Sequence, residues 1–435
     1  FMGPNSVGVA EGAKWKGLRT AIGKSLKPKY IRSLYSDMRE CTKSIVQWLN
    51  EKAKEKSIKV DDGEESGNMN GVIVDVAQFL HALTLDIVCM TVFQEKLGAI
   101  AAIEKGKPDE VVAAFRYASD EMARRCSSTN PLDWMYWLSA RPKQRKLNHA
   151  NSIIRDRVEK VIERRLKRGF LDSDDDLLHH MLVEAKNKLK PKGEKNNNSV
   201  SKTDFKDPSV SNVIIDNVIT MMWAGHDTTA AGLSFCLYRM SVHQDVQKRL
   251  REEIIQCKSD NGIPSQDPLP HELVMKLPFL NAVVMETLRL HPPALWTQRG
   301  MTQDVTLYNE TRDKSVTIPY GSNVFLPIYA VHHSESNWEN PEKFTPERFL
   351  DKDGNQDNSK YHPFAFVPFG GGNRVCPGQT LAQFEFKTIL STLVEHFHFS
   401  PVKSPEPKGD YHQPTIKSCG MFQDCVDNLL HITSI

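Results

Sequence analysis

The sequence predicts a mainly α-helical fold with a minor β part. Apolar residues recur with the 3.6-residue period of amphipathic helices through most of the first 290 residues. Strand-like stretches are short and lie late in the chain, where Pro and Gly become more frequent. The chain has 435 residues, 40% of them apolar and 25% charged. This composition excludes a disordered or fibrous chain and provides for a large core.

The pattern predicts one domain over residues 1–435. We expect helices over residues 11–23, 29–57, 72–93, 109–127, 145–168, 211–242, 244–257, 272–290 and 378–397. Short strands are expected at Val305–Tyr308, Ser315–Ile318, Asn323–Ile328 and Leu429–Ile432. Residues 61–71 and 187–207 are poor in apolar residues, and we expect flexible linkers there.

Charge and cysteine usage exclude several classes of function. The chain has 56 basic and 54 acidic residues, a net charge of +2, so the molecule as a whole does not attract nucleic acid. Its eight Cys form no C-x-x-C pair and are too sparse for a disulfide scaffold. The apolar stretch Val72–Phe93 is interrupted by Asp75, His81 and Asp86, which favours a buried helix over a membrane span. No signal-peptide pattern is present, and we expect that the chain begins inside a longer protein.

The most informative segment is glycine-rich and runs from Phe369 to Gly378. Its sequence is Phe-Gly-Gly-Gly-Asn-Arg-Val-Cys-Pro-Gly. A phosphate loop would need Lys-Ser/Thr after the last glycine, and a dinucleotide fingerprint would need a preceding strand and a downstream acid. Neither pattern is present. Glycines let the backbone approach a flat group closely, and Pro377 suits the first position of a helix. Backbone N–H groups of that first turn would then stabilise Cys376 as a thiolate.

A thiolate in a dry, donor-rich pocket suits an axial ligand of iron. The pattern F-x-x-G-x-R-x-C-x-G is matched by Phe369, Gly372, Arg374, Cys376 and Gly378, and it resembles the haem-binding loop of the cytochrome P-450 superfamily. The resemblance implies the fold of that family, with haem b between a long central helix and the helix after the Cys loop. It makes Cys376 the iron ligand and places Arg374 beside an anionic group. The alternative is an isolated structural cysteine, against which the further motifs argue.

Two other segments resemble a structural network of the same family. Glu286 and Arg289 lie on one face of an apolar helix that stops at Pro292-Pro293. Alone, such a pair is most often a solvated ion pair worth less than about 1 kcal/mol. Arg348 follows downstream in the sequence Phe-Thr-Pro-Glu-Arg-Phe. By resemblance, Glu286, Arg289 and Arg348 form a buried network that holds the loops behind the haem.

The long apolar helix expected over residues 211–242 has the polar sequence Ala-Gly-His-Asp-Thr-Thr at its centre. Thr228 can bond back to a carbonyl one turn earlier, and a locally opened helix with an acid and a hydroxyl can relay protons. Spacing alone favours a polar kink with a packing role. The segment resembles the oxygen-activating motif of the family, which implies that Thr228 steadies dioxygen and Asp227 supports proton delivery, while Ala224 leaves room. His226 has no ligand partners at useful spacing and is expected to bind no metal.

The expected substrate pocket is apolar. Thr220, Ala224 and Thr228 follow one another at four-residue spacing and would form one stripe facing the haem. Met221 and Trp223 lie nearby as substrate contacts, and Leu295, Trp296, Met421 and Phe422 stand where members of the family line the pocket. A lipophilic substrate is expected, with fatty-acid-like compounds among the candidates.

The N-terminal end of this chain resembles a segment that lies further along the sequence in members of the family. Trp15 and Arg19 match a W-x-x-x-R motif whose side chains bond a haem propionate, and Arg299 resembles another propionate contact. In the family, a membrane anchor, a hinge and the first helices and strands precede this motif. The resemblance therefore implies an N-terminally truncated member.

Basic residues are concentrated in the same region. Seven Lys and Arg and no acid lie between Gly12 and Ser36. A solvated basic face is the general explanation, and a docking patch for an acidic partner is the alternative. The resemblance implies an NADPH-dependent reductase, for which the candidates are Lys14, Lys16, Lys24 and Lys27. No nucleic-acid-binding module is present.

Together, these observations predict a haem-dependent monooxygenase that uses O2 and electrons from NADPH through a reductase. One alternative is a haem-thiolate isomerase or dehydratase, but such enzymes lack the acid–Thr pair found here. The other is a non-catalytic haem-binding fragment or pseudoenzyme, suggested by the missing N-terminal segment. Residence in the endoplasmic reticulum membrane, facing the cytoplasm, is implied by the resemblance alone.

Overall fold

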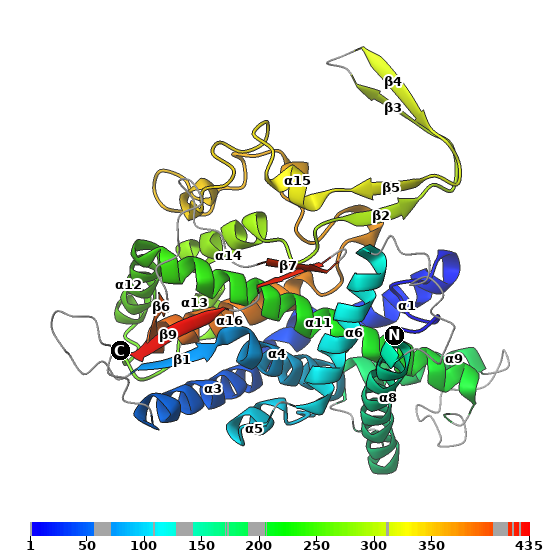
Figure 1. Ribbon diagram of the computed structural model, residues 1–435, viewed down its shortest axis with the longest axis horizontal. Helices are drawn as coiled ribbons and strands as arrows, with labels where there is room; N and C mark the ends of the chain where they lie inside the picture. The colour runs from blue at the N-terminus through cyan, green and yellow to red at the C-terminus, as the bar shows by residue number, and fades with distance from the viewer. Residues whose placement is uncertain are drawn as a thin grey trace.

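The chain folds into a helical body that carries several small β-sheets (Figure 1). The computed structural model describes residues 2–55, 71–107, 109–127, 142–169, 171, 174–189, 205, 207–309, 313–402, 416–419, 422–425 and 428–435. The linkers expected at 61–71 and 187–207 fall almost wholly outside these residues. A continuous apolar core joins residues from Ala10 to Ile432.

Helices account for most of the described structure, as the periodicity predicts. They are α1 (Gly12–Ser25), α2 (Pro28–Ser33), α3 (Tyr35–Glu55), α4 (Val76–Phe93), α5 (Ala99–Glu104), α6 (Glu110–Ser127), α8 (Pro142–Arg168), α9 (Leu177–Leu189), α11 (Pro208–Val242), α12 (Gln244–Asp260), α13 (His271–Val274), α14 (Pro278–Leu290), α15 (Ile328–His332) and α16 (Gln379–His396).

Two expected helices are divided in the structure, and a third is shortened. The helix expected over 29–57 is interrupted at Leu34. The one expected over 272–290 is interrupted before Pro278, which starts α14 because it has no N–H to continue α13. The first residues of the stretch 72–93 form a strand instead, and the carboxylate of Asp75 then caps α4 by accepting from Ala77 N at 3.1 Å.

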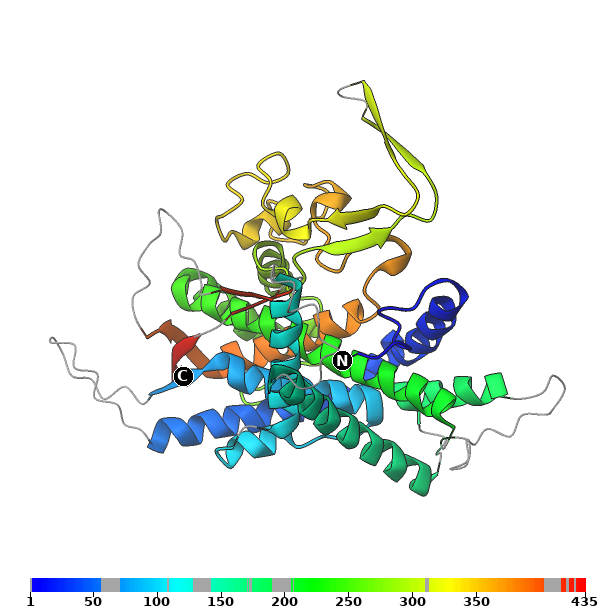
Figure 2. The same ribbon diagram turned by 45° about the vertical axis from the view of Figure 1, so that its right-hand side comes forward.

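The strands among the described residues form four small antiparallel sheets. They are β1 (Gly71–Asp75), β2 (Thr297–Gly300), β3 (Val305–Asn309), β4 (Lys314–Ile318), β5 (Asn323–Leu326), β6 (Phe397–Pro401), β7 (Ile416–Cys419), β8 (Phe422–Cys425) and β9 (Leu429–Ser434). The sheets have the orders β1-β9-β6, β2-β5, β3-β4 and β7-β8. The expected strands correspond to β3, β4, β5 and β9. The β3–β4 hairpin projects away from the helical body (Figure 2).

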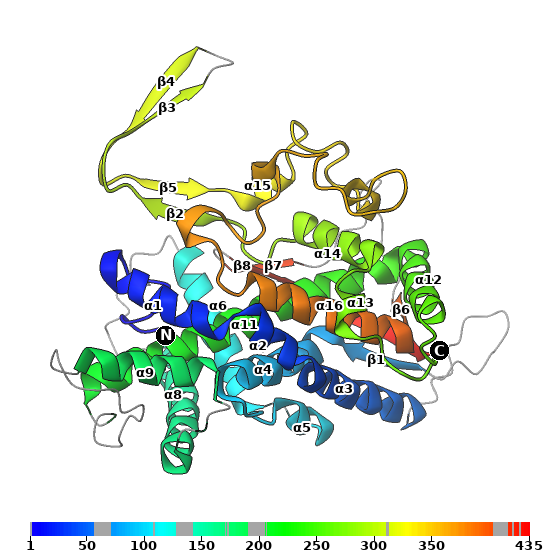
Figure 3. The same cartoon turned by 180° about the vertical axis from the view of Figure 1, so that it is seen from behind.

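The centre of the molecule is the contact between α4 and α11. Helix α14 and helix α16 also pack on α11, and α16 packs on α2 and α3. Figure 3 shows α1, α2 and α16 on the same face of the molecule. Among the described helices, α4 alone is long and apolar enough to cross a membrane, but 89% of it is buried inside the fold. The prediction of a buried core helix is confirmed.

Gly232 of α11 packs against Phe386 of α16. A Cβ built on Gly232 would lie 2.9 Å from Cε2 of Phe386, whereas one on Gly23 in α1 meets nothing within 4 Å. In a helix, Gly→Ala gains about 1 kcal/mol, and forcing an extra group into a packed contact costs about 1–3 kcal/mol. We therefore expect Gly232→Ala to lower the midpoint of thermal unfolding and Gly23→Ala to raise it, at a fixed scan rate. Equal shifts for the two variants would contradict this packing.

Candidate active site

A largely apolar cavity of about 300 Å³ lies between the middle of α11 and the glycine-rich Cys loop. Helix α11 contributes Met221, Ala224, Gly225 and Thr228 to its wall. Ala224 is exposed although most of the surrounding helix is buried, because it faces this cavity. The cavity thus lies where the sequence predicts the haem, between the long central helix and the Cys loop.

The Cys loop presents the Cys376 sulfur to the cavity. Gly370 and Gly372 have φ angles of 74° and 67°, in the left-handed region that glycine adopts without strain. Cys376 N donates to Phe369 O at 3.0 Å, and Val375 N donates to Gly372 O at 3.1 Å, which closes the loop. Cys376 is half-buried, and only Pro377 and Gly378 separate it from the start of α16 at Gln379.

Burial raises the pKa of the Cys376 thiol above its usual value. The backbone N–H groups of Gly378 and Gln379 and the charge of Arg19 lower this pKa, but they do not offset burial. The expectation that N–H groups of the first helical turn act on the sulfur is therefore met, yet they do not stabilise the thiolate by themselves. A bound metal ion deprotonates a coordinating thiol outright.

Guanidinium groups gather beside the loop. Arg299 and Arg374 both line the cavity, and the charge of Arg299 lowers the pKa of Arg374 after the larger effect of burial. Cζ of Arg374 lies 4.3 Å from the centre of the Trp15 ring. Arg19 has a buried Nη1 with no hydrogen-bond partner. Together with the Cys376 sulfur, these residues fit a flat, iron-containing group that carries carboxylates.

The Thr228 hydroxyl lies on the α11 wall of the same cavity. It donates to Ala224 O at 2.7 Å. Because a hydroxyl has one hydrogen, its lone pairs are left to accept a hydrogen bond. Helix α11 remains continuous from Pro208 to Val242, so the local opening expected at this point is not present.

The Asp227 side chain does not line the cavity. Its Oδ1 lies 3.6 Å from Nδ1 of His81 on α4, and its Oδ2 accepts from Ser119 Oγ of α6 at 3.4 Å. Sequence reasoning missed His81 and Ser119, since no motif connects them to residue 227. His226, expected to have no ligand partners, lies beside His81 and Asp227, with their possible ligand atoms within 4.8 Å of one another.

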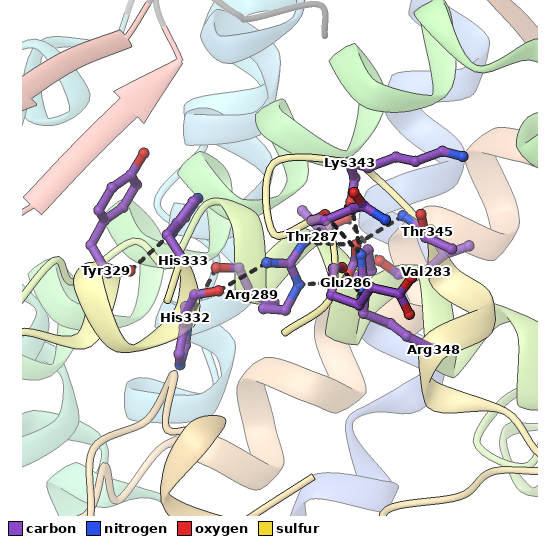
Figure 4. A network of polar contacts seen from close by, with 12 residues as sticks. Val283, Glu286, Thr287, Arg289, Tyr329, His332, His333, Lys343, Thr345 and Arg348 are labelled. Atoms are coloured by element: carbon purple, nitrogen blue, oxygen red, sulfur yellow. Dashed lines mark hydrogen bonds and ion pairs between the residues drawn. The ribbon is translucent and has the colours of Figure 1, made fainter. Parts of the chain in front are cut away.

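Figure 4 shows the buried network around Glu286. Arg289 donates to both carboxylate oxygens of Glu286, at 2.7 and 2.9 Å. Thr345 N and Arg348 Nε also donate to Oε1, at 2.8 and 3.1 Å. Glu286 and Arg289 are fully buried. The structure thus brings together the three residues that the sequence analysis grouped.

Comparison with known proteins decides the family. The model of the cytochrome P-450 family matches residues 3–419. The chain belongs to the cytochrome P-450 family. It is therefore a haem-thiolate monooxygenase at the level of that family.

Individual relatives come from several animals. The chain is 28% identical to cytochrome P-450 9e2 of Blattella germanica, over 91% of this chain and 71% of that protein. It is 28% identical to cytochrome P-450 4d2 of Drosophila melanogaster, over 92% and 73%. It is 31% identical to cytochrome P-450 4F8 of Homo sapiens, over 77% of this chain and 61% of that protein.

The cytochrome P-450 cavity includes some of the residues expected at the site and not others. Of those expected, Met221, Ala224, Thr228, Trp296, Arg299, Phe369, Arg374, Cys376 and Gly378 line it, whereas Trp15, Arg19, Thr220, Trp223, Asp227, Leu295 and Gly372 do not. The Thr220 hydroxyl is buried and already hydrogen-bonded within the protein. It donates to Asp216 O at 2.6 Å and lies 2.8 Å from Ser6 Oγ. Met421 and the side chain of Phe422 lie outside the described residues.

The Glu286 network should be essential for stability of this cytochrome P-450. Glu286→Ala leaves the buried Arg289 charge unpaired, which costs about 3–5 kcal/mol. We expect little soluble protein and a much lower midpoint of thermal unfolding. Asp156→Ala is the control, since it breaks an exposed ion pair with Lys160 and should cost less than about 1 kcal/mol. Equal effects of the two variants would show that the network is not required.

Proposed function

We propose that this chain inserts one oxygen atom of O2 into a lipophilic substrate, using electrons that a reductase draws from NADPH. The observation that carries the proposal is that Cys376 and Thr228 line one largely apolar cavity from two different elements. A thiolate ligand for iron and a hydroxyl on the facing wall are what haem-based oxygen chemistry needs from a protein.

Haem bound at Cys376 supplies the redox chemistry, and the thiolate donates electron density that favours O–O cleavage. The chain's own residues do the rest. The glycines of the loop allow a flat ring to lie close to the backbone. Arg374 and Arg299 offer donors to its carboxylates. Thr228 accepts a hydrogen bond in the cavity, and Asp227 lies next to it in sequence as the acid that supports proton delivery.

The cavity wall supports the choice of substrate class. Met221, Trp296 and Ile328 join Ala224 and Gly225 in its lining. A cavity with apolar walls and few polar groups favours apolar ligands, which lose few hydrogen bonds when they leave water. Fatty-acid-like compounds are the first candidates. The presence of both Asp227 and Thr228 favours oxygen activation over isomerase or dehydratase chemistry.

The first test is the carbon monoxide difference spectrum of the reduced, haem-loaded protein. We expect the strongly red-shifted Soret band of a thiolate–iron complex, and its loss in Cys376→Ala with haem still measurable by absorbance. Cys425→Ala, a buried cysteine on β8, is the control and should keep the band. A wild-type band at the position of neutral-ligand haems would overturn the proposal.

The reductase is proposed to dock on the face formed by α1 and α2. Lys14, Lys16, Lys24 and Lys27 are all exposed there. This face is adjacent to the Cys loop, because Arg374 Nη2 donates to Ala10 O at 3.0 Å and contacts Trp15. Positive charge beside the thiolate steers an acidic electron donor to the side nearest the iron ligand. Association of the protein with the endoplasmic reticulum membrane is proposed with it.

Reversing two of these charges should weaken the reductase interaction. We expect Lys24→Glu/Lys27→Glu to raise the reductase concentration that gives half-maximal NADPH-driven reduction by about tenfold at low ionic strength. The difference should shrink as salt screens the charges. Lys105→Glu/Lys107→Glu, which changes two exposed lysines beside α5, is the control of equal net charge. If the two double variants change the half-maximal reductase concentration equally, the proposed docking site is wrong.

A further inference from the structure

The Asp227 carboxylate belongs to a polar cluster outside the cavity, where α4, α6 and α11 meet. His81 of α4 faces its Oδ1 at 3.6 Å, and Ser119 of α6 faces its Oδ2 at 3.4 Å. The His81 side chain is 4% exposed, and the Asp227 side chain is 24% exposed. The Asp227 carboxylate is thus partly buried, and neighbouring groups can set its orientation.

The direction of the Ser119 hydrogen bond is fixed by a third residue. Trp223 Nε1 donates to Ser119 Oγ at 2.7 Å. An indole nitrogen can only donate, so the serine oxygen accepts there and its own hydrogen is available for Asp227. The Ser119 hydroxyl can therefore donate to Oδ2 of Asp227 and orient that oxygen.

The second histidine of the cluster is neutral. His226 Nδ1 lies 2.9 Å from Met222 O, and a carbonyl only accepts, so Nδ1 carries the hydrogen. Burial, with a smaller contribution from His81, lowers the pKa of His226 to about 3. From α6, Phe115 packs on the His226 ring and Ser119 contacts Asp227, and neither of these two side chains carries a charge. Of the two histidines, His81 is the one whose Nδ1 faces the Asp227 carboxylate, at 3.6 Å.

We propose that His81 and Ser119 are positioning residues for Asp227. His81 is its counter-ion and proton-exchange partner, and Ser119 holds the second oxygen, so that the acid stays ready beside Thr228. This inference rests on the proposed monooxygenase function for its role. It assigns part of the proton-delivery apparatus to α4 and α6, which contribute no motif to the sequence analysis.

The pairing can be tested without turnover. The haem-loaded, ferrous carbon monoxide form is labelled on histidine rings for NMR, and the His81 signal is identified by its loss in His81→Gln. We expect the pKa of His81 to fall by about one unit or more in Asp227→Asn, because an opposite charge is removed. Asp86→Asn is the control on the same helix, since that carboxylate faces the start of α5 instead. An unchanged pKa in Asp227→Asn would overturn the proposal.

Steady-state kinetics tests the role. His81→Gln and Ser119→Ala should lower kcat by about tenfold and leave KM for the substrate unchanged, since neither side chain lines the cavity. Ser119→Thr keeps the hydroxyl and should restore kcat. An unchanged kcat, or an effect on KM alone, would refute the positioning role. A wild-type protein that forms the thiolate complex but hydroxylates nothing would instead count against the proposed function, while the NMR titration would still decide the pairing.

Discussion

The site depends on one buried carboxylate, Glu286, whose charge has to be neutralised inside the core. Arg289 neutralises it with two hydrogen bonds and also donates from Nη1 to His332 O at 2.9 Å. His332 Nδ1 lies 3.1 Å from Arg289 O, and its Nε2 accepts from Val367 N at 2.9 Å. Because burial lowers the pKa of His332 to about 3, the ring is neutral and can donate at one nitrogen and accept at the other. Hydrogen bonds thus connect the ion pair to the Cys loop, where Gly370 N donates to Val367 O at 2.9 Å.

The sequence predicts those parts of the site whose residues lie close together in contiguous motifs. The Cys loop, the Thr228 turn of α11 and the Glu286–Arg289 pair each lie within ten residues, and the structure brings them to the cavity or behind it as expected. His81 and Ser119 were not predictable, because they reach Asp227 across separations of 146 and 108 residues that no local pattern encodes. Thr220 was expected to face the haem from its spacing, but its hydroxyl bonds to Asp216 and Ser6 instead.

The same distinction holds for the fold. Long amphipathic helices were predicted, since their period is written locally. Strand β1 was not, because Val72 takes its conformation from pairing with Ile432, at the other end of the chain. An apolar run gives equal support to a buried helix and to a buried strand. Only the long-range partner decides between them, and Asp75 then marks the change by capping α4.

The charges around the cavity explain why haem and fold should stabilise each other. Burial disfavours the Cys376 thiolate, and Arg299 and Arg374 repel one another at the same wall. Glu385, the acidic residue among the described lining, is buried with its pKa raised well above the usual value, so it offers no compensating charge. A group that brings a cation to the sulfur and carboxylates to the guanidinium groups relieves both penalties together. Its binding energy is then also folding energy for the Cys loop, which the Glu286 network holds from behind.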